Sequence, residues 1–329
     1  MSVKTPAVGL VLGTAIPPEG VREAAAASER IGFDELWLIE DYFFTGAISA
    51  ATAALGATER LPVGIGIVSA MVRHPAVLAM EIATVARMYP GRFRPGVGLG
   101  APAWLDQMGL RPKAQLTALR DCLTAVRDLL AGEAVTRSAF FQFNGISLTY
   151  PPAAPTPLYM GVLARKGLML SGEIADGTIL SVLAGEAYVA WACQQIEVGH
   201  QVARRRDPHR VTALAIFSVD RRAEVAKEAV RSLLAFYLTI AGRSPLTDAY
   251  GISDEVEDMI RQGAGHVERE MPARWLEDLV VAGDPEECAE KIRRLWRAGA
   301  DSVVLLPTPV ERALEVALFA GREVLSRLR

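Results

Sequence analysis

The chain has 329 residues, of which 51% are hydrophobic and 22% are charged, and its formal net charge is -3. This globular composition has no long run of Lys or Arg, which argues against nucleic acid or an anionic membrane as the main partner. The cysteines Cys122, Cys193 and Cys288 lie far apart. Their spacing fits neither a disulfide framework nor a zinc site, and it favours a reducing, cytoplasmic location.

Apolar and amphipathic segments alternate from the N-terminus onward. Residues 8–14, VGLVLGT, predict a buried strand because they are apolar almost throughout. A helix over 20–33 follows, with Gly32 as its natural stop. The next predicted pairs of strand and helix are 34–41 with 48–60, 61–68 with about 75–89, and about 92–99 with 112–132.

The second half of the chain continues this alternation after one extra element. Residues 141–150, FQFNGISLTY, predict a strand pair that turns at Asn144-Gly145. Residues 241–280 are polar and irregular, and we expect them to be an insertion within a single domain over 1–329. The predicted pairs here are 156–163 with 166–175, 176–183 with 185–206, and 210–219 with 222–240.

The C-terminal segment carries the clearest helix signal. Asp284 is followed by Pro285 at the first helical position and by Glu287 three residues after the cap, which is a capping box. The last strand covers 301–307, and Thr308 is expected to cap the final helix in the same way. Eight strands, each followed by a helix, predict a closed (β/α)8 TIM barrel rather than an open Rossmann sheet.

In such a barrel the active site lies at the carboxyl ends of the strands. This rule selects candidates without any other information. They are Gly13 and Thr14 after the first strand, Glu40, Asp41 and Tyr42 after the second, Val68, Ser69 and His74 after the third, Gly98, Gly100 and Trp104 after the fourth, and Gly161, Arg165 and Lys166 after the fifth.

Glycines alternate in the third and fourth strands, at positions 64 and 66 and at positions 96, 98 and 100. Alternate residues of a strand share a face, and glycine there allows a close approach to the backbone. A flat ring system across the barrel mouth would require such an approach. Small residues that make room for barrel packing are the alternative.

Arg165 and Lys166 directly precede a predicted helix. Free N–H groups at a helix start, together with two cations, make a phosphate site. The alternative is a solvated basic corner.

Other candidates also have two interpretations. Glu40 and Asp41 are adjacent, so at most one of them faces the barrel axis and accepts a hydrogen bond from a ring or hydroxyl; a cap or loop acid is the alternative. His74 is either a proton donor or ring-binding group, or a loop residue that helps begin the helix at Pro75. Tyr42, Phe43 and Trp104 would form an apolar substrate wall or ordinary packing. The four histidines show no metal-ligand spacing, so no metal is expected.

Four segments are similar to one known family: GFDELWLIED, RHPAVLAMEIATVARMYPGRFRPGVGLG, ARKGLMLSGEIADGTIL and VAGDPEECAEKIRRLWRAGADSVVL. They resemble the bacterial luciferase-like oxidoreductases, and more closely the branch that uses the deazaflavin coenzyme F420, including methylenetetrahydromethanopterin reductase. The resemblance implies a TIM barrel that binds the coenzyme in its mouth and transfers a hydride to or from a small organic substrate. It also implies a homodimer or a higher homo-oligomer.

The resemblance assigns roles to particular residues. It implies a bulge and a non-proline cis peptide at Gly66–Ile67 or Ile67–Val68 that press on the ring. Glu40 or Asp41 would face the deazaflavin. The remaining coenzyme-binding positions would be Gly13, Gly98, Gly100 and Gly161 at the ring, with Arg165 and Lys166 at the phosphodiester.

The chain departs from the family after its fourth strand. Sugar-phosphate dehydrogenases and the pterin reductase have acids there, where this chain has Ala101-Pro102-Ala103. A different small organic substrate is therefore expected, through C=C or C=N reduction or alcohol oxidation, with proton delivery from His74, Asp41 or water. A monooxygenase that uses flavin mononucleotide (FMN) and a ligand-binding barrel without chemistry are the alternatives.

Overall fold

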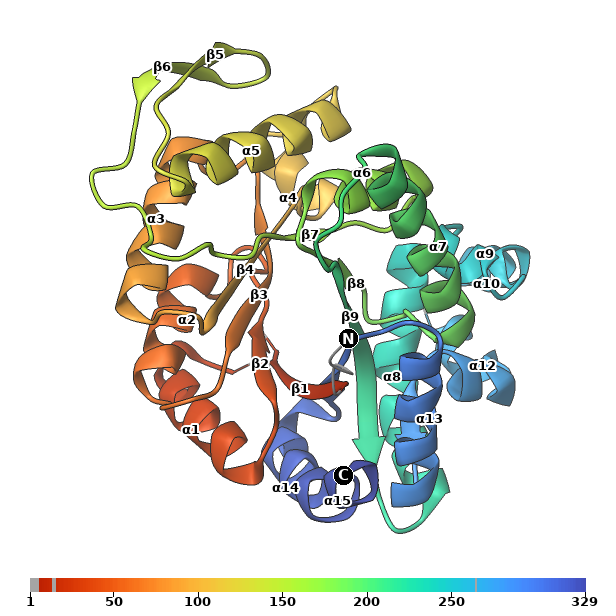
Figure 1. The fold of residues 1–329 in the computed structure, drawn as a ribbon. Helices are drawn as coiled ribbons and strands as arrows, with labels where there is room; N and C mark the ends of the chain where they lie inside the picture. Colours follow the sequence, from red (N-terminus) through yellow and green to blue (C-terminus); the bar gives the residue numbers. More distant parts are fainter. Residues whose placement is uncertain (1–5, 14–15, 264) are drawn as a thin grey trace.

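A computed structural model describes residues 6–13, 16–263 and 265–329. Eight parallel strands form a closed barrel, because β9 pairs with β8 as well as with β11 (Figure 1). The predicted (β/α)8 barrel is therefore confirmed. The barrel strands are β1 (Ala7–Leu12), β2 (Glu35–Leu38), β3 (Val63–Ser69), β4 (Phe93–Gly98), β7 (Tyr159–Gly161), β8 (Gly177–Leu180), β9 (Arg210–Val219) and β11 (Ser302–Pro307).

Helices surround this barrel (Figure 1). Those that follow barrel strands are α1 (Val21–Ile31), α2 (Ala47–Gly56), α3 (Pro75–Met88), α4 (Pro102–Gln107), α5 (Gln115–Leu130), α6 (Arg165–Ile174), α7 (Glu186–Val202), α8 (Ala223–Ala241), α14 (Ala313–Glu323) and α15 (Leu325–Leu328), with short 3-10 helices η1 (Pro18–Gly20) and η2 (Val310–Arg312). In the described part of the chain, no helix has the length and apolar character needed to cross a bilayer.

Residues 241–280, predicted as an insertion, contain four short helices between α8 and the extra strand β10 (Val281–Gly283). β10 pairs in parallel with the C-terminal end of β9, and α13 (Pro285–Arg297) follows β10. The four helices are α9 (Pro245–Asp248), α10 (Ser253–Arg261), α11 (His266–Glu270) and α12 (Ala273–Asp278).

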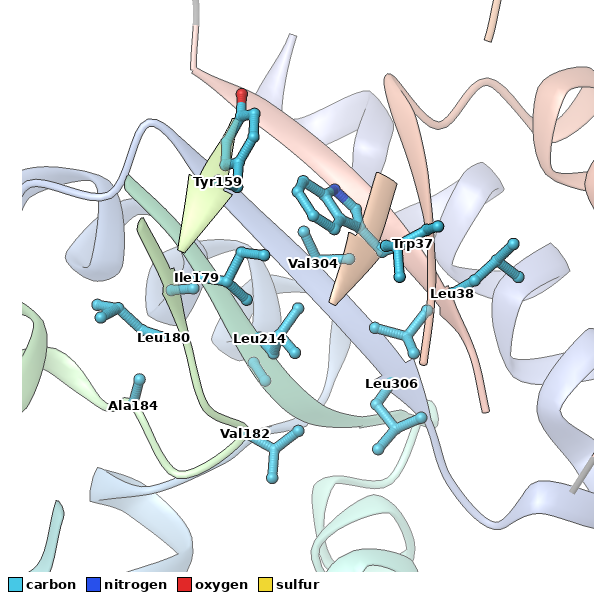
Figure 2. Packing of buried hydrophobic residues seen from close by; sticks show 14 of the residues in the cluster. Trp37, Leu38, Tyr159, Ile179, Leu180, Val182, Ala184, Leu214, Val304 and Leu306 are labelled. Carbon is cyan, nitrogen blue, oxygen red and sulfur yellow. The ribbon is translucent and has the colours of Figure 1, made fainter. Parts of the chain in front are cut away.

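Large side chains fill the barrel interior (Figure 2). Trp37 and Tyr159 pack edge to face, with their ring centroids 5.5 Å apart, and both are buried. A Cβ atom on Gly64 would lie 2.5 Å from the Trp37 ring, so glycine is required at that position by packing. The interior is thus a packed core rather than a pore, and ligands must bind at its ends.

The amino ends of the strands carry a buried charged cluster. Glu35 is 1% exposed, forms ion pairs with Arg94 and Arg210, and accepts a hydrogen bond from the Ser302 hydroxyl. Burial lowers the pKa of Arg94, and the neighbouring charge of Arg210 adds to this effect. The two guanidinium groups share one carboxylate, so Glu35 is the residue on which this cluster depends.

His209 lies at the same end of the barrel, just before β9. Its Nε2 is 2.7 Å from the Thr178 hydroxyl, and its Nδ1 is 3.2 Å from the carbonyl oxygen of Ala175. Burial lowers the pKa of His209 to about 4, and the charge of Arg205 adds to this effect. The folded protein therefore holds this imidazole neutral.

This arrangement predicts a loss of stability in mild acid. Below the ordinary histidine pKa near 6.5, the imidazole of His209 binds a proton in the unfolded chain but stays neutral in the folded chain. The free energy of unfolding should therefore fall between pH 6.5 and about 4, by up to about 3 kcal/mol in total. The free energy of unfolding, measured by urea titration at several pH values in this range, should depend less steeply on pH for His209→Gln than for the unchanged protein. The matched variant His266→Gln should keep the full slope; equal slopes in all three proteins would refute the prediction.

The capping box predicted at Asp284 is confirmed. The Asp284 carboxylate accepts hydrogen bonds from the N–H groups of Glu286 and Glu287, and the Glu287 side chain accepts one from the N–H of Asp284. Gly32 ends α1 in the left-handed conformation, with φ of 99°, as expected.

Two local predictions were wrong. The strand pair exists as β5 (Val135–Ser138) and β6 (Gln142–Ile146), but Asn144 and Gly145 lie within β6, where the register shifts. The turn lies before Gln142, where the Asp121 carboxylate accepts a hydrogen bond from the N–H of Phe141. Thr308 does not cap the last helix, because its hydroxyl donates back to the carbonyl of Leu306 and a 3-10 turn begins α14.

Candidate active site

The carboxyl ends of the barrel strands bring most of the predicted site residues together. Gly13 and Asp41 line one cavity, and Tyr42 lies beside Ser69, Gly100 and Trp104. A third group joins Gly66 and Ile67 to Gly98 and Gly161, and Arg165 and Lys166 at the start of α6 follow Gly161 closely in the sequence. Thr14 lies outside the described residues.

Strand β3 has the irregularity that the resemblance implied. Its pairing with β4 shifts between Ile65 and Val68, and the Gly66–Ile67 peptide is cis. Gly66 and Ile67 remain partly exposed, whereas Val68 is only 1% exposed and pairs with Val97. Val68 is therefore a core residue, and Gly66 and Ile67 are the part of β3 that can meet a ligand.

The alternating glycines serve mainly to accommodate side chains. A Cβ atom on Gly98 would lie 2.8 Å from Cδ1 of Ile67, and one on Gly161 would lie 2.6 Å from its Cγ2. A Cβ atom on Gly96 would lie 2.2 Å from the carbonyl oxygen of Ile65. These contacts fit the packing interpretation of the glycines, because Ile67 occupies the space above them. Gly98 and Gly161 therefore support Ile67, and any ring at this point rests on Ile67.

Glu40 is engaged in holding the backbone after β2. Its carboxylate accepts hydrogen bonds from both terminal nitrogens of Arg73, at 2.7 and 3.0 Å, and from the N–H of Ala47, at 3.0 Å. Glu40 is 9% exposed, so this pairing is mostly shielded from water. The prediction that Glu40 faces a ring is not supported by this geometry, and its alternative as a cap is the observed arrangement.

Arg73 is a residue of this region that the sequence did not predict. Its hydrogen bonds with Glu40 raise its pKa, and its Nε lies 3.2 Å from a carboxylate oxygen of Glu81 on α3. Burial raises the pKa of Glu81, and the charge of Arg73 opposes that rise. Arg73 thus ties the end of β2 to α3. The only sequence signal for it is an arginine directly before the His-Pro pair.

Tyr42 forms the centre of an aromatic group at the mouth. Its ring centroid lies 5.8 Å from that of Trp104 and 6.1 Å from that of Phe43, to which it is joined by a cis peptide. Burial raises the pKa of Tyr42, and a hydrogen bond with Ser69 opposes that rise. Phe43 is 71% exposed, so of these side chains it is the one that extends furthest into solvent.

His74 begins α3 instead of facing the mouth. Its Nδ1 accepts a hydrogen bond from the N–H of Ala76, and its Nε2 lies 3.2 Å from the carbonyl oxygen of Gln142 in β6. A single tautomer with the proton on Nε2 satisfies both contacts. Its ring packs between Phe141 and Phe143. The predicted catalytic role of His74 is therefore not supported, because both ring nitrogens are bound to the backbone.

The start of α6 has the geometry of an anion site. Ala164 caps this ten-residue helix without any side-chain hydrogen bond to its first turn. Arg165 and Lys166 occupy the first two helical positions and are exposed. The first N–H groups of the helix thus have no side-chain cap, and two cationic residues occupy its first turn. Lys166 also lines a hollow between α5 and α6 with Arg120 and Glu173.

A cavity of about 650 Å³ runs from the carboxyl ends of β11, β1 and β2 to a groove between α1 and α14, where Ser28 and Leu314 line it. Helix α8 covers it with Leu233, Phe236 and Tyr237, and Asp41 lies on its wall. Burial raises the pKa of Tyr237 to about 12, and the charge of Asp41 adds to this effect. Its phenol is therefore protonated at neutral pH and can donate a hydrogen bond. No sequence pattern indicates Tyr237, because α8 approaches the mouth only in the folded chain.

Comparison with known proteins decides the family. A family profile described as luciferase-like monooxygenase matches residues 2–302. The chain belongs to this family. It is 26% identical to the 5,10-methylenetetrahydromethanopterin reductase of Archaeoglobus fulgidus, over 92% of this chain and 93% of that protein. It is 28% identical to the F420-dependent glucose-6-phosphate dehydrogenase of Nakamurella multipartita, over 95% of this chain and 93% of that protein.

A solved structure agrees with this assignment. The coenzyme F420-dependent tetrahydromethanopterin reductase of Methanopyrus kandleri superposes with a TM-score of 0.87 at 25% identity, covering 98% of this chain and 99% of that chain. The luciferase-like relatives include a reductase and a dehydrogenase with different substrates. Membership of the family therefore leaves the substrate of this chain to be argued from its own residues.

Proposed function

We propose that the chain is an F420-dependent oxidoreductase that transfers a hydride between the deazaflavin and a small organic substrate. The observation that carries this proposal is the uncapped start of α6, with Arg165 and Lys166, next to the bulged segment of β3. Gly161 connects the start of α6 with the bulged segment of β3, because it lies against Ile67 and precedes Arg165 by four residues. The F420-dependent dehydrogenase of Nakamurella multipartita and the F420-dependent reductase of Methanopyrus kandleri, each matched over more than nine-tenths of this chain, support the same coenzyme.

The described residues fit this coenzyme in outline. Arg165, Lys166 and the first N–H groups of α6 would hold a phosphate-bearing tail, and Ile67 would support one face of a ring. When bound, the deazaflavin supplies the hydride donor or acceptor. The chain would orient the deazaflavin ring and the substrate carbon toward each other. The aromatic group around Tyr42 would help to exclude water from the barrel mouth. Asp41 and Tyr237 are the groups at the cavity that could bind or move a proton.

An FMN-dependent monooxygenase is the second candidate. It is favoured by the description of the family itself as luciferase-like monooxygenase. The same phosphate site would serve that cofactor, so the two candidates differ in the ring and in oxygen chemistry.

The test is a titration of the ligand-free protein with F420 and separately with FMN, followed by fluorescence quenching. We expect tight binding of F420 and weaker binding of FMN. Replacing Arg165 and Lys166 together by Ala should weaken F420 binding about 10- to 100-fold, because charge-assisted hydrogen bonds are lost. Arg221→Ala with Arg222→Ala removes two adjacent exposed cations before α8 and should leave the affinity unchanged. Tighter binding of FMN, with oxygen consumption, would favour the second candidate instead.

We also propose that the chain acts in the cytoplasm as a homo-oligomer. Exposed apolar side chains on one helix support self-association. Val77, Met80 and Met88 of α3 are 45%, 53% and 55% exposed. A second copy of the chain could cover these side chains, because removing apolar surface from water lowers the free energy.

A further inference from the structure

The charged cluster at the amino end of the barrel carries more positive than negative charge. Arg94 of β4 and Arg210 of β9 both contact the same oxygen of Glu35, its Oε2, and Nη2 of Arg210 lies 3.2 Å from it. The other oxygen of Glu35 accepts the hydrogen bond from the Ser302 hydroxyl. Arginine stays protonated in proteins. Two cations therefore share one carboxylate, and that carboxylate belongs to a residue that is 1% exposed.

In the described part of the chain, no second carboxylate pairs with Arg94 or Arg210. Two other acids at this end of the barrel are bound elsewhere. Asp176 pairs with two other arginines at 2.9 and 3.0 Å, and Asp301 accepts a hydrogen bond from a backbone N–H of β9 at 2.8 Å. The residues outside the described ranges include no Asp or Glu, so they cannot supply a carboxylate side chain. One positive charge of the cluster is therefore left over.

Hydrogen-bonding groups beside the cluster lack a partner as well. Nε of Arg210 and the hydroxyl of Thr212 are buried, and neither has a hydrogen-bond partner among the described residues. Thr212 pairs with Ser302 in the register of β9 and β11. Leu214 and Val304, two residues further along these strands, lie in the barrel interior (Figure 2), so Thr212 and Ser302 face the interior too. Such groups cost free energy unless water or a ligand binds them.

The cluster can be reached from solvent but not from the candidate active site. The side chains of Arg94 and Arg210 are 19% and 21% exposed, so a small ion can approach them from the amino end of the barrel. Trp37 lies two residues beyond Glu35 in β2 and packs against Tyr159. These buried rings close the interior above the cluster, so a ligand here is separate from one bound at the mouth.

We propose that the cluster binds a small monovalent anion, such as chloride, between the guanidinium groups of Arg94 and Arg210. A single negative charge neutralises the surplus cation and accepts hydrogen bonds from N–H groups that Glu35 leaves free. Water would bind the same groups but would leave the charge uncompensated, and charges interact more strongly in this shielded place than in bulk water. The site stabilises the folded barrel, and the inference does not depend on the proposed function.

The test compares the melting temperature of the full chain in sodium chloride and in sodium gluconate at the same ionic strength. At about 0.2 M salt, chloride should raise the melting temperature by about 2 °C or more relative to gluconate, because a ligand that binds only the folded state stabilises it. Arg210→Gln leaves one cation for one carboxylate and should abolish this difference. Arg111→Gln, which removes a cation from an exposed ion pair, is the control and should keep the difference.

A second variant and a direct observation cover the case in which Arg210→Gln does not fold. Thr212→Val keeps every charge but removes one hydroxyl, so about 3- to 10-fold more chloride should be needed for the same rise in melting temperature. Crystals soaked in sodium bromide should show an anomalous peak in contact with the guanidinium groups of Arg94 and Arg210.

Equal melting temperatures of the unchanged protein in chloride and gluconate would overturn the proposal, and water would then be the partner of the free donors. It would also be overturned if the difference survived in Arg210→Gln, if Thr212→Val responded to chloride like the unchanged protein, or if bromide bound only elsewhere on the molecule.

Discussion

Arg73→Met is expected to destabilise the protein by about 3–5 kcal/mol, because it leaves the buried Glu40 carboxylate without its cation. Among the described residues, only the N–H of Ala47 would still donate a hydrogen bond to that carboxylate. The free energy of unfolding can be measured by urea titration with tryptophan fluorescence. We expect a lower midpoint with an unchanged slope, since the surface exposed on unfolding stays the same.

The control for Arg73 is an arginine in an exposed ion pair. Arg111 lies 2.9 Å from Asp106, and both side chains are about half exposed, so Arg111→Met should change stability by no more than about 0.5 kcal/mol. Adding Glu40→Gln to Arg73→Met should recover part of the loss, because the unpaired charge is then removed. Similar losses for the Arg73 and Arg111 variants would mean that the buried pair contributes little.

Glu35→Gln should have an effect at least as large at the opposite end of the barrel. The substitution leaves Arg94 and Arg210 close together without the carboxylate that both contact. Removing one partner of a buried ion pair costs about 3–5 kcal/mol, and here two cations lose their partner at once. Thermal denaturation should show the loss as a clearly lower midpoint.

A second substitution separates the charge effect from the loss of a side chain. Glu35→Gln combined with Arg210→Gln keeps one cation and two neutral amides, and it should be more stable than Glu35→Gln alone. If the double variant is instead less stable by the sum of the two single losses, the two sites are independent and this account of the cluster is wrong.

The order of strands and helices could be predicted because each is encoded locally. The apolar segments and the capping box at Asp284 depend on residues within a few positions of each other. The turn of the β5–β6 pair was misplaced because it is fixed by Asp121, twenty residues before Phe141. A local turn signal at Asn144-Gly145 could not reveal that contact.

The site was less predictable because its contacts join distant segments. The partners Glu40 and Arg73 are 33 residues apart, and nothing near Glu40 in the sequence identifies Arg73. The two interpretations of the fourth-strand glycines differ only in whether Ile67 fills the space above them. That depends on the bulge in β3, which pattern alone does not show. Tyr237 reaches the mouth from a helix almost 200 residues after Asp41.

The contacts of Glu40 also limit how the mouth can open. Its carboxylate binds Ala47 at the far end of the loop 41–46 while Glu40 itself precedes that loop, so one side chain anchors both ends. Moving the two ends of this loop apart would break that hydrogen bond and leave part of a buried carboxylate without a partner, which opposes such a motion. The exposed ring of Phe43 is carried by this tied loop, so rotation of its side chain needs no separation of the loop ends.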